Sequence, residues 1–148
     1  RYMLKLKALY DADFNLWVEE QVNALKSGRM TDLDLPNLIE EIEDLARQDK
    51  QALRRHLRSL FMYLLKWQYQ PARRSNSWEV SMTRSRIEIE ELLSTSPSLK
   101  SYLPTVVDKA YAHSIILASD ETGLENKVFP LNCPYTLDQA LDIDFLPE

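Results

Sequence analysis

Apolar residues recur along this chain at steps of three and four, which is the spacing of one face of an α-helix. The most regular run predicts a long helix at about residues 36–69. Its stripe is Leu38, Ile42, Leu45, Asp49, Leu53, His56, Leu60, Leu64 and Trp67. Pro36 suits a first helical turn and Pro71 ends the helix. Acidic residues precede basic ones along this helix, as the helix dipole favours.

A shorter helix is predicted before it, at about residues 12–27. Asp11 or Asp13 can cap its start and Gly28 can close its end. After Pro71, a third helix is expected to begin with Ser77 as its cap and to break at residues 94–98. Its stripe is Trp78, Met82, Ser85, Ile89 and Leu92.

A fourth helix is predicted to follow and to stop near Gly123, with Pro104 marking its start or a bend. Its stripe is Leu103, Val106, Ala110, His113 and Leu117. Thr136 and Gln139 have capping-box spacing, so a short helix is expected at 136–142.

These elements predict an all-α fold: a bundle of about four main helices plus a short C-terminal helix, with little or no β structure. Only 2 glycines occur, which favours helices over sheets and phosphate loops. We expect a single helical domain over residues 1–148. In it, residues 1–10 form an N-terminal extension and the proline-containing tail 124–148 packs on the bundle.

Composition and charge limit the cellular locations and the kinds of partner that we expect. The net charge of −5 disfavours bulk attraction to nucleic acid. Residues 47–86, however, hold ten Lys or Arg against two acids, a local charge of +8 that leaves −13 for the rest. Cys133 is the single cysteine, so a reducing, cytoplasmic location is expected. No apolar run approaches the roughly 20 residues of a membrane span, so no membrane partner is expected.

Two polar residues interrupt the stripe of the long helix, and they define a candidate polar core site. Asp49 and His56 need partners if buried, and His113 and Glu41 are the further candidates. Asp49 and His56 lie seven residues apart, about 10 Å along a helix, so they share an ion only with ligands from other helices. The alternative is a core histidine bonded to a carboxylate or a backbone carbonyl. The metal, the cofactor and any catalytic residue stay unassigned.

Two charged clusters are further candidates. The basic one suggests nucleic-acid binding or an antitoxin-like regulatory role, but the favoured alternative is a solvated basic face that pairs with the acidic one within the chain or across a dimer. It comprises Arg54, Arg55, Arg58, Arg73, Arg74 and Arg84. The acidic one fits the first turns of a helix as well as a cation site. It comprises Glu40, Glu41, Glu43 and Asp44.

Several blocks of the sequence resemble a bacterial family, the domain of unknown function number twenty-nine, over about residues 9–148. The blocks are Asp11-x-Asp-Phe-x-x-Trp-x-x-x-Gln21, residues 37–45, His56-Leu, residues 65–71, Arg73 through Trp78, residues 96–99, and Phe129-Pro through Tyr135. The resemblance implies an α-helical, cytoplasmic bacterial protein with no established activity. The chain departs from the family pattern at Ala46, Asp49 and Tyr63, where Gly, Glu and His are usual. Without a histidine at 63, a metal or catalytic role is less supported.

Two functional classes lead these expectations. The first is a non-catalytic helical protein that acts by self-association, as a dimer or larger homo-oligomer, or through a protein partner; its separated charges favour complementary docking. The second is a metal-binding or hydrolytic bundle that uses His56, Asp49 and His113. Nucleic-acid binding through residues 54–86 is a third, less favoured alternative.

Overall fold

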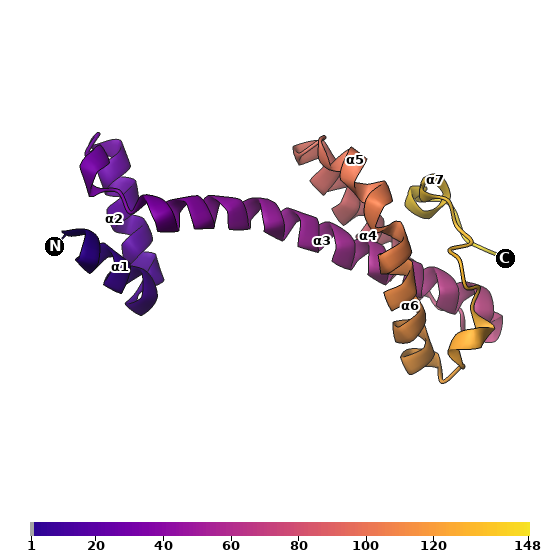
Figure 1. The fold of residues 1–148 in the computed structure, drawn as a ribbon. Helices are drawn as coiled ribbons and strands as arrows, with labels where there is room; N and C mark the ends of the chain where they lie inside the picture. The colour runs from indigo at the N-terminus through magenta and orange to yellow at the C-terminus, as the bar shows by residue number, and fades with distance from the viewer. Residues whose placement is uncertain (1) are drawn as a thin grey trace. The chain divides into compact units, whose positions relative to one another are not determined.

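The computed structural model describes residues 2–148, with the side chains of residues 2–4, 6 and 7 left out of the description, and it confirms the all-α class (Figure 1). The described residues contain no strand. The helices are α1 (Tyr2–Ala12), α2 (Phe14–Lys26), α3 (Leu35–Tyr69), α4 (Asn76–Thr95), α5 (Leu99–Tyr102), α6 (Val107–Thr122) and α7 (Leu137–Leu141). Contacts group the chain into two compact units, residues 1–48 (unit 1) and 49–148 (unit 2). The single domain over 1–148 stays a prediction.

Local signals place most helix ends. The long helix expected at 36–69 is α3, Leu35–Tyr69. Asp13 caps α2, because its carboxylate accepts from the backbone N–H of Leu16 at 3.1 Å. Gly123 ends α6 in the left-handed region, at a φ of 76° that favours glycine. Thr136 and Gln139 form the expected capping box of α7.

Unit 1 is a small helical unit with few buried side chains. Helix α1, where only an N-terminal extension was expected, packs against α2 (Figure 1). The rings of Tyr10 and Trp17 meet edge to face, with centroids 4.8 Å apart. Of the large apolar side chains in this unit, Trp17 and Leu33 are the buried ones among the described residues.

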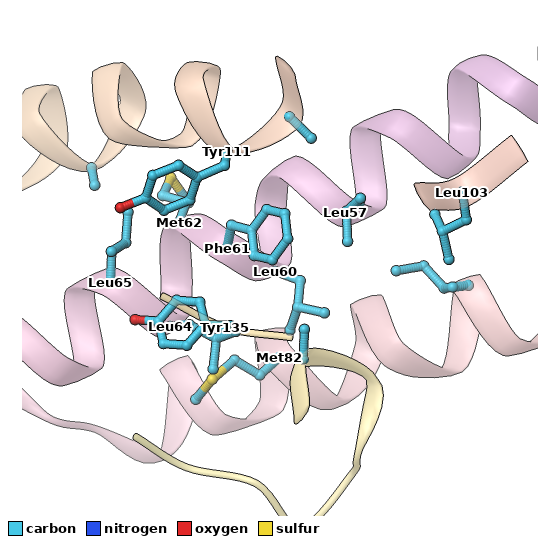
Figure 2. Packing of buried hydrophobic residues seen from close by; sticks show 14 of the residues in the cluster. Leu57, Leu60, Phe61, Met62, Leu64, Leu65, Met82, Leu103, Tyr111 and Tyr135 are labelled. Atoms are coloured by element: carbon cyan, nitrogen blue, oxygen red, sulfur yellow. The ribbon is translucent and has the colours of Figure 1, made fainter. Parts of the chain in front are cut away.

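Unit 2 holds the main hydrophobic core, built on the C-terminal part of α3 (Figure 2). Leu53, Leu60 and Leu64 of the predicted stripe are fully buried, and so is Leu57, which the stripe did not include. Ile42 and Leu45 of the same stripe are exposed. They pack with buried side chains of α4, α6 and the C-terminal segment, including Met82, Ile89, Ala110, Tyr111, Ala118 and Tyr135. The Phe61 ring lies 5.9 Å from that of Tyr111 and 6.4 Å from that of Tyr135.

The segment after α6 is held to the helices of unit 2 by buried tyrosines. The Tyr111 hydroxyl donates to the carbonyl of Pro130 at 2.6 Å. The Tyr135 hydroxyl donates to the side-chain oxygen of Gln68 at 2.7 Å. Burial raises the pKa of both hydroxyls. These bonds are satisfied inside the core, so both tyrosines serve packing.

Two helices of unit 2 differ in detail from the sequence expectation. The cap of α4 is Ser75, whose hydroxyl accepts from the N–H of Trp78, and not Ser77. On α6 the buried side chains are Ala110, Tyr111, Ser114 and Ala118, so the stripe is rotated and His113 and Leu117 are exposed. Helix α6 carries apolar residues on several of its faces, so their spacing does not show which face is buried. None of the helices in the described residues combines the length and apolar character that crossing a bilayer requires.

Candidate functional site

The structure gives the two histidines of the candidate polar core site different neighbours. His56, on α3, is half-buried, and burial, with the nearby charge of Arg55, lowers its pKa while Glu88 of α4 opposes the shift. His113, on α6, is exposed and lines a hollow of ≈ 250 Å³ with Arg58, Ile116 and Leu117. No hydrogen bond of the described residues joins the two histidines. The convergence of the two histidines on one site stays a prediction.

The other two residues of the candidate polar core site, Asp49 and Glu41, belong to different units. Asp49 is half-buried on α3, at the start of unit 2. Glu41 belongs to unit 1, where its carboxylate accepts the hydroxyl of Tyr10. Within the described part of the chain, no group of three or more His, Cys, Asp or Glu side chains is placed to hold a metal ion.

Two of the six arginines in the predicted basic cluster make hydrogen bonds inside unit 2. Arg54 donates to the Tyr102 hydroxyl at 2.6 Å. Arg74 donates to the carbonyls of Trp67 and Glu148, each at 2.8 Å, and its guanidinium lies over the Trp67 ring. The other members divide into half-buried Arg58 and exposed Arg55, Arg73 and Arg84. The partners of Arg54 and Arg74 are neutral, so both arginines keep their charge, and a nucleic-acid-binding role for the cluster stays a prediction.

Sequence reasoning missed the most buried arginine of unit 2. Arg86, on α4, is 4% exposed and donates to the carbonyls of Ala140, Ile143 and Phe145 at 2.7, 3.4 and 2.9 Å. These bonds satisfy the C-terminal end of α7 and hold the chain that follows it. The available signal was spacing: position 86 continues the buried stripe that contains Met82 and Ile89.

Unit 1 exposes two rows of large apolar side chains, which we call the unit 1 apolar surface. Most strongly exposed are Ile42 at 65% and Leu45 at 63%. On helical spacing, Leu35, Ile39 and Ile42 continue the face of α3 that buries Leu53 and Leu57 further along the helix. The surface comprises Phe14, Val18, Val22 and Leu25 of α2 and Leu35, Ile39, Ile42 and Leu45 of α3.

A buried polar cluster joins α2 to the first turn of α3. The fully buried Asp34 carboxylate accepts from the indole N–H of Trp17 at 3.1 Å and from the Asn37 amide at 2.8 Å. The side-chain oxygen of Gln21 accepts from the backbone N–H of Asp34 at 2.8 Å. One Asp34 oxygen and the Gln21 amide nitrogen have no partner among the described residues. The paired groups fix how the two helices meet, and with them the apolar rows.

Charges beside this surface are mostly paired within unit 1. Arg47 bonds to Asp44, which raises the pKa of the guanidinium, and lies 3.7 Å from Glu43. The Tyr10–Glu41 hydrogen bond raises the pKa of Tyr10 to about 12. Glu41, Glu43 and Asp44 thus make local contacts, whereas the apolar rows are the exposed feature of unit 1 among the described residues.

Comparison with known proteins adds a family and no activity. The family model described as "Domain of unknown function DUF29" matches residues 9–146. No curated protein and no solved structure matches the chain.

Proposed function

The chain belongs to the family described as Domain of unknown function DUF29, and from that premise we propose that it acts by association, with unit 1 as the module through which two copies assemble. The unit 1 apolar surface is the observation that carries this proposal. The cytoplasmic location expected from the single cysteine is kept as part of it.

The small size of unit 1 supports the proposal that its apolar surface is buried against a second protein surface. A domain of about 60 residues buries only about 60% of the surface of its unfolded chain and is marginally stable. Unit 1 has 48 residues. Its apolar surface alone leaves eight large apolar side chains exposed, while few are buried among the described residues of the unit. Contact with a second protein surface would supply burial that the unit does not achieve by itself.

The charge order along α3 favours a second copy as the partner. Acids at positions 40–44 precede bases at 47–55 on one continuous helix. An antiparallel α3 from another copy places acids against bases in both halves of the contact, whereas a parallel one places like charges together. Such a two-fold arrangement is self-complementary and is the commonest form of homo-oligomer.

The apolar area that a dimer would bury sets the scale of the free energy gained on association. Burying a Leu, Ile or Val side chain fully is worth about 1.5–3 kcal/mol, so a half-exposed one yields roughly 1 kcal/mol. In an α3–α3 contact the four such side chains of α3 from each of two copies yield roughly 8 kcal/mol before the cost of association, which is about 4–15 kcal/mol. This gross gain lies within the range of that cost, and burial of the four apolar side chains of α2 would add to it.

Sedimentation velocity of the full chain over a wide concentration range tests the proposal. We expect a dimer that dissociates on dilution. Ile42→Glu should give a monomer at concentrations where the wild type is dimeric. Ile116→Glu is the matched control, because Ile116 is a 51% exposed isoleucine on a helix of unit 2, and it should leave the dimer intact.

Two results would overturn the proposal that copies of the chain associate through unit 1. One is a wild-type chain that stays monomeric at every concentration, which would leave the apolar surface to a different protein. The other is a dimer that Ile116→Glu disrupts and Ile42→Glu does not, which would place the interface on unit 2.

A further inference from the structure

A cavity in unit 2 combines apolar walls with a buried positive charge. It has a volume of ≈ 310 Å³ and lies between α4, α5, α7 and the residues after α7. Ile89, Leu93, Leu141 and Ile143 provide the apolar walls, while Arg86 and Lys100 bring two cations. Glu90 and Ser94 complete the lining, so the charge of the cavity is net positive.

Arg86 is a buried cation that neutral groups alone contact. Its three hydrogen bonds go to backbone carbonyls. Among the described residues, no carboxylate oxygen lies within 4.0 Å of its guanidinium. A guanidinium has five N–H donors, so two are left over. Burial lowers the pKa of Arg86, and the charges of Asp142 and Asp144 oppose this shift without bonding to the guanidinium. A ligand anion in the adjoining cavity would use the N–H donors that are left over and add to this partial compensation.

Lys100 supplies an accessible cation for the same anion. Its side chain is exposed on α5, and it lines the cavity together with the half-buried Leu93 and Leu141. A ligand that places its charge near Lys100 and its apolar body against these leucines matches both kinds of wall. The cavity thus has two cations, Arg86 and Lys100, beside apolar walls. A few polar groups set among apolar side chains are the usual make-up of a small-molecule site.

We propose that this cavity binds a small aliphatic monocarboxylate, with its carboxylate toward Lys100 and Arg86 and its chain against Ile89, Leu93, Leu141 and Ile143. The volume lies at the lower end of the range for ligand sites, about 300–1,000 Å³, which selects a short chain over a long lipid. Glu90 opposes a second negative charge, so a monocarboxylate is favoured over a dicarboxylate. This site lies within unit 2 and does not depend on the association of unit 1.

Titration of the full chain with sodium hexanoate, followed by calorimetry and by backbone amide shifts, tests the proposal. We expect saturable binding at one site, with shifts concentrated in residues 86–94, 100 and 141–143. Hexanamide carries the same chain without the charge, and acetate carries the charge without the chain. Each should bind at least tenfold more weakly than hexanoate.

Variants locate the site without relying on Arg86, whose loss would free the chain after α7. Lys100→Ala should weaken hexanoate binding on the order of threefold, as expected for a partly exposed ion pair. Lys109→Ala removes another exposed lysine, on α6, and should leave the affinity unchanged. Leu93→Trp should fill the cavity and abolish binding.

The proposal is wrong if hexanoate does not saturate, or if hexanamide binds as tightly as hexanoate. It is also wrong if the shifts lie outside the cavity, or if Lys109→Ala weakens binding as much as Lys100→Ala. The dimer of unit 1 is measured separately by sedimentation, so failure of one proposal leaves the other standing.

Discussion

Replacing Trp17 with phenylalanine should destabilise unit 1 and leave the stability of unit 2 unchanged. Trp17 is 1% exposed, and its indole N–H donates to the buried Asp34 carboxylate at 3.1 Å. Phenylalanine removes the donor and leaves the carboxylate oxygen with the Asn37 amide alone. Loss of a buried hydrogen bond to a charged group costs about 1.5–3 kcal/mol. The smaller ring leaves unfilled space that costs about 1 kcal/mol more.

The sum, about 3 kcal/mol, is large for a unit of this size. At 0.05–0.15 kcal/mol per residue, the 48 residues of unit 1 have a stability of roughly 2–7 kcal/mol. Amide hydrogen exchange in α2 should therefore accelerate on the order of a hundredfold, since 1.4 kcal/mol is a factor of ten. Exchange of α3 amides at 57–65 should not change.

Trp67→Phe is the matched control, because the Trp67 ring packs in unit 2 beneath Arg74 and should not affect α2. All variants are compared at one protein concentration, because association itself adds stability. Unchanged exchange in α2 of Trp17→Phe would refute the reasoning. Equal acceleration in both units would also refute it, and would favour the single cooperative domain that the sequence predicts.

Three further predictions test other parts of the fold. Because the pKa of Tyr10 is raised from 10.0 to about 12 by its bond to Glu41, this contact should be fully present below pH 10 and lost as the pH rises through about 12. Ultraviolet titration of Tyr10→Phe should lack a phenolate transition near pH 12, and an unchanged curve would contradict the contact. Because burial lowers the pKa of His56 below 6.5, its neutral form stabilises the fold above pH 6.5, and this stabilisation is lost as the pH falls through the folded-state pKa. Proton NMR titration should give a pKa of His56 below 6.5, and a pKa at or above 6.5 would count against its burial. His56→Gln should make the unfolding free energy fall less steeply as the pH is lowered below 6.5. Leu60→Ala, at a fully buried position, should lower the unfolding free energy by about 2–5 kcal/mol in chemical denaturation, whereas Leu131→Ala, at a 90% exposed one, should change it by less than about 0.5 kcal/mol. Similar losses for the two variants would contradict the core placement.

Helices were the part of the fold that sequence could predict well, because their signals are local. Alternating steps of three and four located α3 to within one residue at each end. Asp13, Gly123 and the Thr136–Gln139 pair act within a turn of the helix ends that they cap. Such signals need no knowledge of distant residues.

The partners of charged side chains could not be predicted in this way, because they lie far along the chain. Arg54 bonds to Tyr102, Arg74 to Glu148 and Arg86 to Ala140. Each pair is separated by about fifty residues or more, and periodicity reports on one helix at a time. The sequence therefore showed a basic cluster where the structure has several internal hydrogen bonds.

The same limit applies to the apolar stripe of α3. The predicted stripe places Leu38, Ile42 and Leu45 on one face with Leu53. Spacing does not say what covers that face. In the structure Leu53 is buried within unit 2, whereas Ile42 is 65% exposed. The proposed function starts from this difference.

The most direct test of the account is the mass of the full chain by sedimentation equilibrium, measured for the wild type, Ile42→Glu and Ile116→Glu at matched concentrations. The account predicts twice the chain mass for the wild type and Ile116→Glu, and the chain mass for Ile42→Glu. A single chain mass for the wild type at every concentration would contradict it.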